Sequence, residues 1–571
     1  MSVDIDTAAP GGLPADTAAP RPKPRIFALS FSGPGLVVAA LFLGISLQPS
    51  LLPRAGYVQG LASGITMMIG YGIGAGAQSL WNYLGIPTLK GRWRTVIVGV
   101  IIALIAWGVL FSAWRQVGWQ NEIRTTFGME SITFTVWPVI IGVALGVSVL
   151  ILIVARSLRK LFRAVFAWLD RLLPRRLAQV LGAGALLLLI WLLITGLLVN
   201  GFFAVANTMF SSRDGATSPG IEQPTSAARS GSPESLVKWD ELGRQGRSFV
   251  ASGPTVAQLD AFSGGGAMEP IRAYVGLKSA ATLQERADLL LAELKRTGAF
   301  DRKALVLTTT TGTGFLDPNG VNPVDYIFNG DDAIAGVQYS YLPSWISLLA
   351  DQDAVKETSR VVFETVHGYW STLPEASRPK FYLYGLSLGS YGVESVLNSI
   401  SIINAPIDGA FMSGPPFVND LHTIVETGRE PSSPEWLPVY QNGTTVRFMN
   451  EEGFAVTAGT WGSTRVVYLQ HGSDPVVFFS PSLAWGAPDW LAETPRAPDV
   501  APQMGWFPLV TMWQVALDLP GAGNVPDGFG HMYSKQANAL GWIAVTNPPG
   551  WTPEQSKKLV ATLNATSTTS D

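Results

Sequence analysis

The residues whose types could support chemistry begin in the stretch K-F-Y-L-Y-G-L-S-L-G-S-Y, residues 380–391. At its centre Gly385-Leu386-Ser387-Leu388-Gly389 forms a Gly-x-Ser-x-Gly pattern, which is a weak signal alone because it often occurs by chance. Here an apolar stretch typical of a buried strand precedes the pattern, and a stretch typical of a helix follows it. A serine at such a junction is held on a tight turn with its hydroxyl presented, so the context predicts Ser387 as a nucleophile.

A serine nucleophile needs a base, and the base needs an acid that orients it. When the nucleophile lies on a strand-to-helix turn, the expected chain order is serine, acid, histidine. The chain has only four histidines. His367 precedes the serine within an expected helix, and His422 falls in a variable region after an expected strand. The remaining candidates are His471 and His531.

Asp474 and His531 complete the expected triad. The sequence V-V-Y-L-Q-H-G-S-D-P-V-V places Asp474 in the loop after the expected strand 464–469. His531 lies in G-F-G-H-M-Y, a glycine-flanked turn just before an expected helix. Ser387, Asp474 and His531 therefore satisfy order, spacing and local context together. His471 is too close to Asp474 in sequence to present to both groups, and we expect it to line the pocket or support the triad.

Backbone N–H groups are expected to bind the oxyanion of such a site. The amide of Leu388 directly follows the nucleophile, and a second donor is expected from the loop after an earlier strand. The loop T-T-T-G-T-G-F, residues 309–315, supplies it, with Thr311 or Gly312 as the expected donor. The glycines also suggest phosphate binding, but the loop lacks the lysine of a P-loop.

Composition argues against several other kinds of chemistry. The chain has no cysteine, which excludes disulfides, cysteine-ligated zinc and cysteine nucleophiles. Asp331 and Asp332 lack a third ligand for a metal and are more typical of a helix start. We therefore expect no cofactor and no metal. A net charge of −3, with no basic face outside the membrane loops, argues against a nucleic-acid partner.

The elements that must position these residues alternate in type after residue 236. The expected strands are 270–277, 303–309, 380–384, 407–412 and 464–469, and the expected helices are 279–297, 354–373 and 388–399. Thr282-x-x-Glu285 forms a capping box at the start of the first of these helices. This alternation predicts a mostly parallel sheet with helices on both faces.

Two further segments are expected to shape specificity. Residues 414–463 follow a core strand and are expected to form a lid. Residues 478–513 include the aromatic side chains Trp485, Trp490, Trp506, Phe507 and Trp513. They fit an acyl pocket, contact with a membrane surface or ordinary core packing.

The first part of the chain has the composition of a membrane domain. Hydrophobic residues make up 47% of the chain and charged residues only 14%, and nearly all of the charge deficit falls before residue 211. Five apolar stretches have the length that a bilayer requires. They are 34–52, which Pro49 and Pro53 interrupt, then 58–84, 95–114, 133–155 and 180–208. Four glycines in Y-G-I-G-A-G-A, at positions 70, 72, 74 and 76, would let helices approach closely.

Flanking charges predict the orientation of these spans. The basic residues on one side are Arg21, Lys23, Arg25, Lys90, Arg92, Arg94, Arg156, Arg159, Lys160, Arg163, Arg171, Arg175 and Arg176. The loops on the other side carry only Arg54, Arg115 and Arg124. Because positive loops stay cytoplasmic, we expect a cytoplasmic N-terminus and an extracytoplasmic chain after residue 210. The expected parts are a disordered tail 1–30, a five-span domain 31–210, a polar linker 211–235 and a catalytic domain 236–571.

The second half of the chain resembles the α/β-hydrolase superfamily. More narrowly, the chain resembles the actinobacterial family of multi-pass membrane proteins that end in an α/β-hydrolase catalytic domain. The motifs that carry this resemblance are T-T-T-G-T-G, Y-I-F-N-G-D-D-A, Q-Y-S-Y-L-P-S-W, Y-L-Y-G-L-S-L-G-S and H-G-S-D-P-V-V. The resemblance implies an α-helical multi-pass membrane domain followed by an α/β-hydrolase domain, acting as a membrane-anchored serine hydrolase of lipase or esterase type.

Together these features predict a serine esterase that acts on lipid or cell-envelope acyl esters at the extracytoplasmic face of the cell membrane. The same residues would support acyl transfer, in which only the acceptor differs. A transporter or scaffold whose hydrolase domain only binds, and a receptor with a catalytically idle domain, are the alternatives from other classes.

Overall fold

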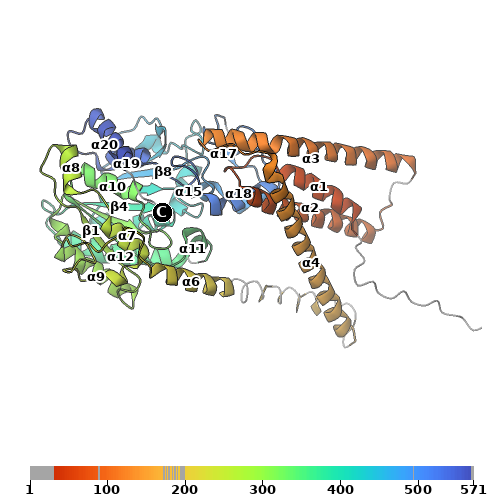
Figure 1. Ribbon diagram of the computed structural model, residues 1–571, viewed down its shortest axis with the longest axis horizontal. Coiled ribbons are helices and arrows are strands. Elements are labelled where there is room, and N and C mark those ends of the chain that lie inside the picture. The colour runs from red at the N-terminus through yellow and green to blue at the C-terminus, as the bar shows by residue number, and fades with distance from the viewer. Residues whose placement is uncertain are drawn as a thin grey trace, which may run out of the picture.

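The chain was analysed as a computed structural model, which describes residues 31–566 apart from 88–90, most of 172–199, 351 and 493. The predicted tail 1–30 lies outside the described residues. Figure 1 shows a bundle of long helices from the N-terminal part of the chain beside a helix-covered sheet formed by the rest.

Eight strands within the described residues form one sheet. They are β1 (Ile271–Val275), β2 (Ala304–Thr309), β3 (Asp332–Val337), β4 (Lys380–Leu386), β5 (Gly409–Ser413), β6 (Val446–Asn450), β7 (Gly453–Phe454) and β8 (Arg465–Leu469). Their order across the sheet is β1-β3-β2-β4-β5-β8-β6-β7, and all neighbours are parallel except the β6–β7 pair. This confirms the predicted, mostly parallel sheet. The carboxyl ends of β4, β5 and β8 therefore meet at one edge.

Two segments differ from the expectations drawn from sequence. Asp332 begins strand β3 rather than a helix, because the small apolar run A-I-A-G-V fits between β1 and β2. The segment 414–463, expected as a lid, contains strands β6 and β7. Phe448 and Met449 on β6 are fully buried, so this part of the segment belongs to the sheet.

Helices cover both faces of the sheet, as Figure 1 shows. On one face lie α9 (Leu283–Arg296), α12 (Gln352–Thr372) and α13 (Leu388–Leu397). On the other lie α8 (Val256–Ser263), α10 (Pro318–Ile327), α19 (Lys535–Thr546) and α20 (Pro553–Ala565). The capping box predicted at Thr282 and Glu285 is present at the start of α9, with both of its hydrogen bonds.

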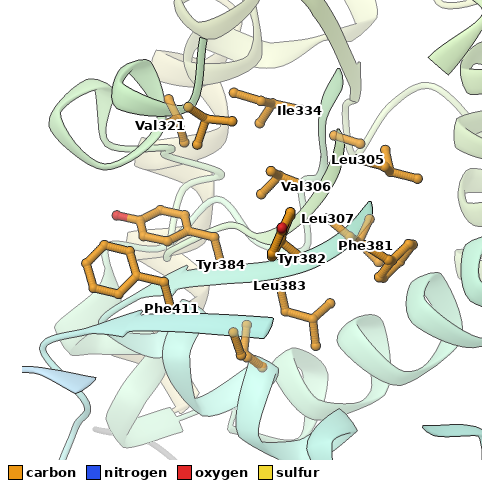
Figure 2. Close-up of a cluster of buried hydrophobic side chains, with 14 of the residues drawn as sticks. Leu305, Val306, Leu307, Val321, Ile334, Phe381, Tyr382, Leu383, Tyr384 and Phe411 are labelled. Atoms are coloured by element: carbon orange, nitrogen blue, oxygen red, sulfur yellow. The ribbon is translucent and has the colours of Figure 1, made fainter. Parts of the chain in front are cut away.

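The core explains why the central strands are apolar on both faces. Figure 2 shows side chains of β2, β4 and β5 projecting from opposite faces of the sheet. The rings of Tyr382, Tyr384 and Phe411 pack against Trp542 of α19, with centroids 6.2, 5.7 and 5.5 Å away. Phe381 instead packs against Trp370 of α12, at 5.2 Å. Successive side chains of a strand point to opposite faces, so a central parallel strand buries both.

The N-terminal part is helical throughout most of its described length. Its main helices are α1 (Gly33–Ser46), α2 (Gly56–Tyr83), α3 (Arg92–Thr126), α4 (Trp137–Leu169) and α6 (Asn200–Asp214). Within the part of the chain that the structure describes, two helical segments, Arg92–Thr126 and Phe134–Leu169, are long and apolar enough to cross a membrane. Helix α1 has 14 residues and so spans only about 21 Å, because residues 47–55 with their two prolines leave the helix. Much of the predicted fifth span, including 193–199, lies outside the described residues, and its last part belongs to α6.

Glycines set the close contacts of α2 with its neighbours. An added Cβ would lie 2.8 Å from the Val38 carbonyl oxygen at Gly70, and 2.5 Å from the Pro34 carbonyl oxygen at Gly74. Both carbonyl groups belong to α1, so these two glycines let α2 approach α1 closely, as small residues at helix interfaces do. At positions 72 and 76 an added Cβ would meet nothing within 4 Å, so only two of the four glycines act in this way.

The segment predicted as a linker packs against the sheet domain. Residues 211–214 belong to α6, and the backbone of Arg229 pairs with that of Arg272 on β1 as an isolated parallel β-bridge. Arg229 also donates from Nη1 to the carbonyl oxygens of Val250 and Ser252, each at 2.6 Å. The domain boundaries remain predictions, but much of this connection is held in place.

Candidate active site

Ser387 lies on the turn between β4 and α13, in a conformation that L-residues rarely adopt. Its φ is 55° and its ψ is −128°. A non-glycine residue in such a region costs about 1–3 kcal/mol and persists only where the surroundings impose it. Its amide donates to the Ser413 carbonyl oxygen of β5 at 2.9 Å, and its carbonyl accepts from the Ser390 amide at 2.8 Å. These bonds fix the backbone of the predicted nucleophile.

The flanking glycines leave room for this turn. An added Cβ on Gly385 would lie 2.2 Å from the carbonyl carbon of Gly389. An added Cβ on Gly389 would lie 2.3 Å from the Thr309 carbonyl oxygen at the end of β2. Only glycine therefore fits at both positions, which gives the Gly-x-Ser-x-Gly pattern a steric reason.

His531 and Asp474 form a close hydrogen bond at the carboxyl end of the sheet. His531 Nδ1 donates to Asp474 Oδ2 at 2.6 Å. Asp474 is fully buried at the N-cap of the short helix α16 (Pro475–Phe478), where its Oδ1 accepts from the Val476 amide at 2.8 Å. Tyr533 Oη donates to Asp474 Oδ2 at 2.7 Å. Three donors thus satisfy a carboxylate that would otherwise be costly to bury.

The second nitrogen of His531 is available for chemistry. Because Nδ1 donates to Asp474, Nε2 is the nitrogen that can accept a proton. Nε2 is buried and bonds to no protein atom within the described part of the chain. The imidazole lies against Gly414, where an added Cβ would be 2.5 Å from His531 Cε1. Gly414 follows Ser413, whose carbonyl accepts from the Ser387 amide, so the end of β5 contacts both the serine turn and the histidine.

A second acid–histidine pair supports the loop that carries His531. His471 Nε2 donates to Glu451 Oε1 at 2.9 Å, and His471 Nδ1 donates to the Gly530 carbonyl oxygen at 2.8 Å. Glu451 Oε1 also accepts from the Ser534 amide at 3.0 Å. The pair therefore bonds to the loop on both sides of His531, at Gly530 before it and at Ser534 after it. The expectation that His471 lies outside the triad agrees with this geometry.

The protonation of this pair follows from its partners. Both ring nitrogens of His471 face acceptors, so the ring is satisfied as the imidazolium ion. Burial lowers the pKa of His471, but the hydrogen bond and charge of Glu451 outweigh it, and the pKa is raised above the ordinary 6.5. Burial raises the pKa of Glu451, but hydrogen bonds from His471 and Ser534 outweigh it, and the pKa falls below the ordinary 4.5. Both shifts favour the charged pair.

The predicted oxyanion donors lie beside the turn but differ in their partners. Leu388 is the first residue of α13, so its amide has no acceptor within the helix. The Thr311 amide donates to the Phe315 carbonyl oxygen at 3.0 Å, and the Gly312 amide donates to Tyr339 Oη at 2.8 Å. Both loop amides are therefore engaged in this structure, and their role as donors to an oxyanion stays a prediction.

The other two histidines serve the core. His367 is buried on α12, with its Nε2 2.8 Å from the Ala405 carbonyl oxygen. His422 is buried with its Nε2 2.7 Å from Gln470 Oε1. Among the described residues no group of three or more acids, histidines and cysteines is placed to hold a metal ion.

The aromatic residues of 478–513 do not share one environment. Trp490 is buried and packs against Phe478, with ring centroids 5.5 Å apart, so it belongs to a core cluster. Trp485 is 73% exposed. Trp506 donates from Nε1 to the Leu483 carbonyl oxygen at 2.9 Å. Only Trp485 among these three has the exposure that contact with a membrane surface requires.

A serine on a strained strand-to-helix turn, followed in the chain by an acid and a histidine at the same edge of a parallel sheet, is the arrangement of α/β-hydrolases. The comparisons with known proteins agree. Residues 271–559 match the model of an alpha/beta-hydrolase family, and residues 47–254 match the model of that family's N-terminus. The chain therefore belongs to this alpha/beta-hydrolase family. No curated protein and no solved structure gives a significant match.

Replacing Gly389 should damage the turn. In Gly389→Ala the new methyl group would lie 2.3 Å from a backbone oxygen of β2 that cannot move aside. We expect unfolding to become easier by about 1–3 kcal/mol, with loss of any Ser387 reactivity. Thermal unfolding and the rate of serine labelling measure the two effects. Gly368→Ala is the matched control, because Gly368 is an exposed position of α12 where an added Cβ meets nothing within 4 Å. Equal behaviour of the two variants would contradict this account of the turn.

The Glu451–His471 pair should make stability depend on pH. Because the folded pKa of His471 is raised, its contribution is fully present below the ordinary 6.5 and is lost as the pH rises through the raised value. We expect the wild type to lose about 1–3 kcal/mol over this rise. Because the pKa of Glu451 is lowered from 4.5, its share is lost only in more acidic solution.

Unfolding temperatures measured from about pH 5 to pH 9 test this dependence. Glu451→Gln should remove most of the alkaline decline, since the amide carries no charge to hold the proton on His471. Curves of the wild type and of Glu451→Gln that run parallel across this range would contradict the assignment of a charged pair.

Proposed function

We propose that the protein is a membrane-anchored serine hydrolase that acts on acyl esters, with Ser387, His531 and Asp474 as its catalytic triad. The observation that carries the proposal is the hydrogen bond of 2.6 Å between His531 Nδ1 and Asp474 Oδ2, which leaves Nε2 free. The end of β5 contacts both His531 and the strained Ser387 turn. This is the combination that a serine nucleophile needs for activation.

The proposed reaction has two halves. Ser387 Oγ attacks the ester carbonyl carbon while His531 Nε2 takes the hydroxyl proton, and Asp474 stabilises the imidazolium that forms. The Leu388 amide, with a donor from residues 309–315, stabilises the oxyanion. The alcohol then leaves with the proton from Nε2, and an acyl-serine ester remains. Water, deprotonated by Nε2, attacks this ester, and the acid and the free serine are released. An alcohol acceptor in place of water would give acyl transfer.

Exposure of the long helices supports the proposed membrane anchoring. Only 6% of the most apolar stretch of Arg92–Thr126 and 17% of that of Phe134–Leu169 are buried. Leu104, Trp107 and Leu110 on α3 are 63%, 68% and 69% exposed. A core helix of a water-soluble protein would bury such side chains, whereas a bilayer covers them. The basic residues of the tail and of residues 156–176 favour a cytoplasmic N-terminus and an extracytoplasmic catalytic domain.

Substrate class is proposed from this placement. A catalytic domain held at a membrane meets lipids and acylated envelope components at high local concentration. Exposed Trp485 is also suited to the interface between water and lipid. We propose lipid or cell-envelope acyl esters as the substrates. We also propose that the protein is related to the actinobacterial multi-pass membrane proteins that end in a hydrolase domain.

Ester hydrolysis by the full-length protein in detergent tests the activity. With p-nitrophenyl butyrate as substrate, Ser387→Ala and His531→Ala should lower kcat by about 10³-fold or more. Ser395→Ala on α13 is the control, because its hydroxyl bonds only to the Gly392 carbonyl oxygen of its own helix. A Ser387→Ala protein with wild-type turnover, or a wild type without turnover on esters of any chain length, would contradict the proposal.

Orientation can be tested with single cysteines, since the chain contains none. Both Ser377, before β4, and Lys160, on α4, are exposed positions. In intact cells a membrane-impermeant maleimide should label Ser377→Cys, and should label Lys160→Cys only after permeabilisation. The opposite pattern would place the catalytic domain in the cytoplasm.

A further inference from the structure

The segment between α1 and α2, residues 47–55, leaves the helical bundle and enters the catalytic domain. Leu51 and Leu52 are only 1% and 2% exposed. They pack in one apolar cluster with Val476, Val477 and Phe478 of α16 and with Val515 of helix α18 (Val510–Asp518). Because α16 directly follows Asp474, the cluster places a helical-domain segment behind the catalytic acid.

A buried ion pair fixes this segment to the catalytic domain. Arg54 Nε lies 2.8 Å from Asp518 Oδ1, and each side chain is 1% exposed. Arg54 Nη2 donates to the Gln514 carbonyl oxygen at 2.7 Å, and Ser50 Oγ donates to Asp518 Oδ2 at 2.5 Å. The Arg54 amide donates to Gln120 Oε1 of α3 at 2.7 Å. A buried pair needs such additional hydrogen bonds, and removal of one partner leaves an uncompensated charge.

The ion pair lies at the start of the chain segment that ends in His531. Asp518 is the last residue of α18, and the His531 amide donates to the Ala522 carbonyl oxygen at 2.9 Å. Leu52 lies against Gly530, since an added Cβ there would be 3.2 Å from Leu52 Cδ2. The segment 518–531 is therefore held at Asp518 by the ion pair with Arg54, and at Gly530, directly before the histidine, by the contact with Leu52.

Helix α3 adds a second support to the same loop. Phe127 follows the last residue of α3, and its ring stacks on that of Phe529 with centroids 4.4 Å apart and planes 21° apart. Phe127 is 1% exposed. Phe529 is two residues before His531, so the helical domain contacts this loop from two of its own segments.

We propose that Arg54 is a positioning residue for catalysis, which acts through Asp518 and the neighbouring Leu52 contact to hold the His531 loop in its place beside Asp474 and Ser387. The inference rests on the proposed hydrolase function. It assigns the helical domain a part in building the active site, in addition to anchoring it. Arg54 touches no reacting atom, and its effect passes through the packing of residues 518–531.

The test compares Arg54→Met with the wild type in the full-length protein in detergent, with p-nitrophenyl butyrate as substrate. A misplaced histidine should lower kcat by about 10- to 100-fold and leave KM within about twofold, because the ester still binds. The acidic limb of the pH profile of kcat/KM should also shift, because the environment of the general base has changed. Arg54→Lys keeps the charge but loses the planar fork, so it should restore part of kcat.

Arg115→Met is the matched control, because Arg115 is a helical-domain arginine whose pair with Glu122 is exposed, at 35% and 44%. Its kcat and pH profile should equal those of the wild type. Leu52→Ala provides the test where Arg54→Met fails to fold, because it removes the contact with Gly530 and leaves the ion pair intact. It should lower kcat with little change in KM.

Two results separate the inference from the function on which it rests. If Ser387→Ala abolishes turnover, while folded Arg54→Met and Leu52→Ala keep the wild-type kcat and pH profile, the positioning role is wrong and the hydrolase function stands. A lower unfolding temperature with unchanged kcat has the same meaning, since a purely structural contact would behave in this way. If Ser387→Ala retains full turnover, the proposed function itself fails.

Discussion

The hydrogen bond from His531 to Asp474 joins two loops that are 57 residues apart in sequence, and most of the candidate site serves to maintain it. A carboxylate with no exposed surface is costly unless donors surround it, and Asp474 receives them from Val476, Tyr533 and His531. The bond also fixes the tautomer of the histidine, because a donor at Nδ1 leaves Nε2 free to accept a proton. Neither loop could hold this geometry alone, since each is a short irregular segment at the end of an element.

Rigid neighbours therefore hold the site from several sides. Parallel strands bring their carboxyl ends to one edge, which places the strained Ser387 turn beside the loops after β5 and β8. The charged pair of Glu451 and His471 forms hydrogen bonds with the loop that carries His531. The helical domain supports the same loop through Leu52 and Phe127. A site assembled in this way is preorganised by its scaffold, as differential stabilisation of a transition state requires.

Local patterns in the sequence predicted strands β1, β2, β4, β5 and β8 and helices α9, α12 and α13, because strand periodicity, the capping box at Thr282 and the Gly-x-Ser-x-Gly turn depend on neighbouring residues. The catalytic roles of Ser387, Asp474 and His531 stay predictions. Strand β3 was missed because Asp332 opens it directly after Asp331, and the burial of Asp332 depends on the strands beside it. Glu451 and Arg54 could not be identified in this way. Their partners lie 20 and 464 residues away, and no local spacing reports such contacts. The engagement of the Thr311 amide depends on how the loop folds back to Phe315, and that of the Gly312 amide depends on Tyr339, which lies 27 residues away.

The central claim is that Ser387 is a nucleophile activated by His531. Its most direct test is treatment of the full-length protein with a fluorophosphonate probe, followed by mass spectrometry that locates the adduct. The account predicts one adduct, on the peptide that contains Ser387, which is absent in Ser387→Ala and forms much more slowly in His531→Ala. Absence of any adduct on the folded wild type, or an adduct on another residue that persists in Ser387→Ala, would contradict it.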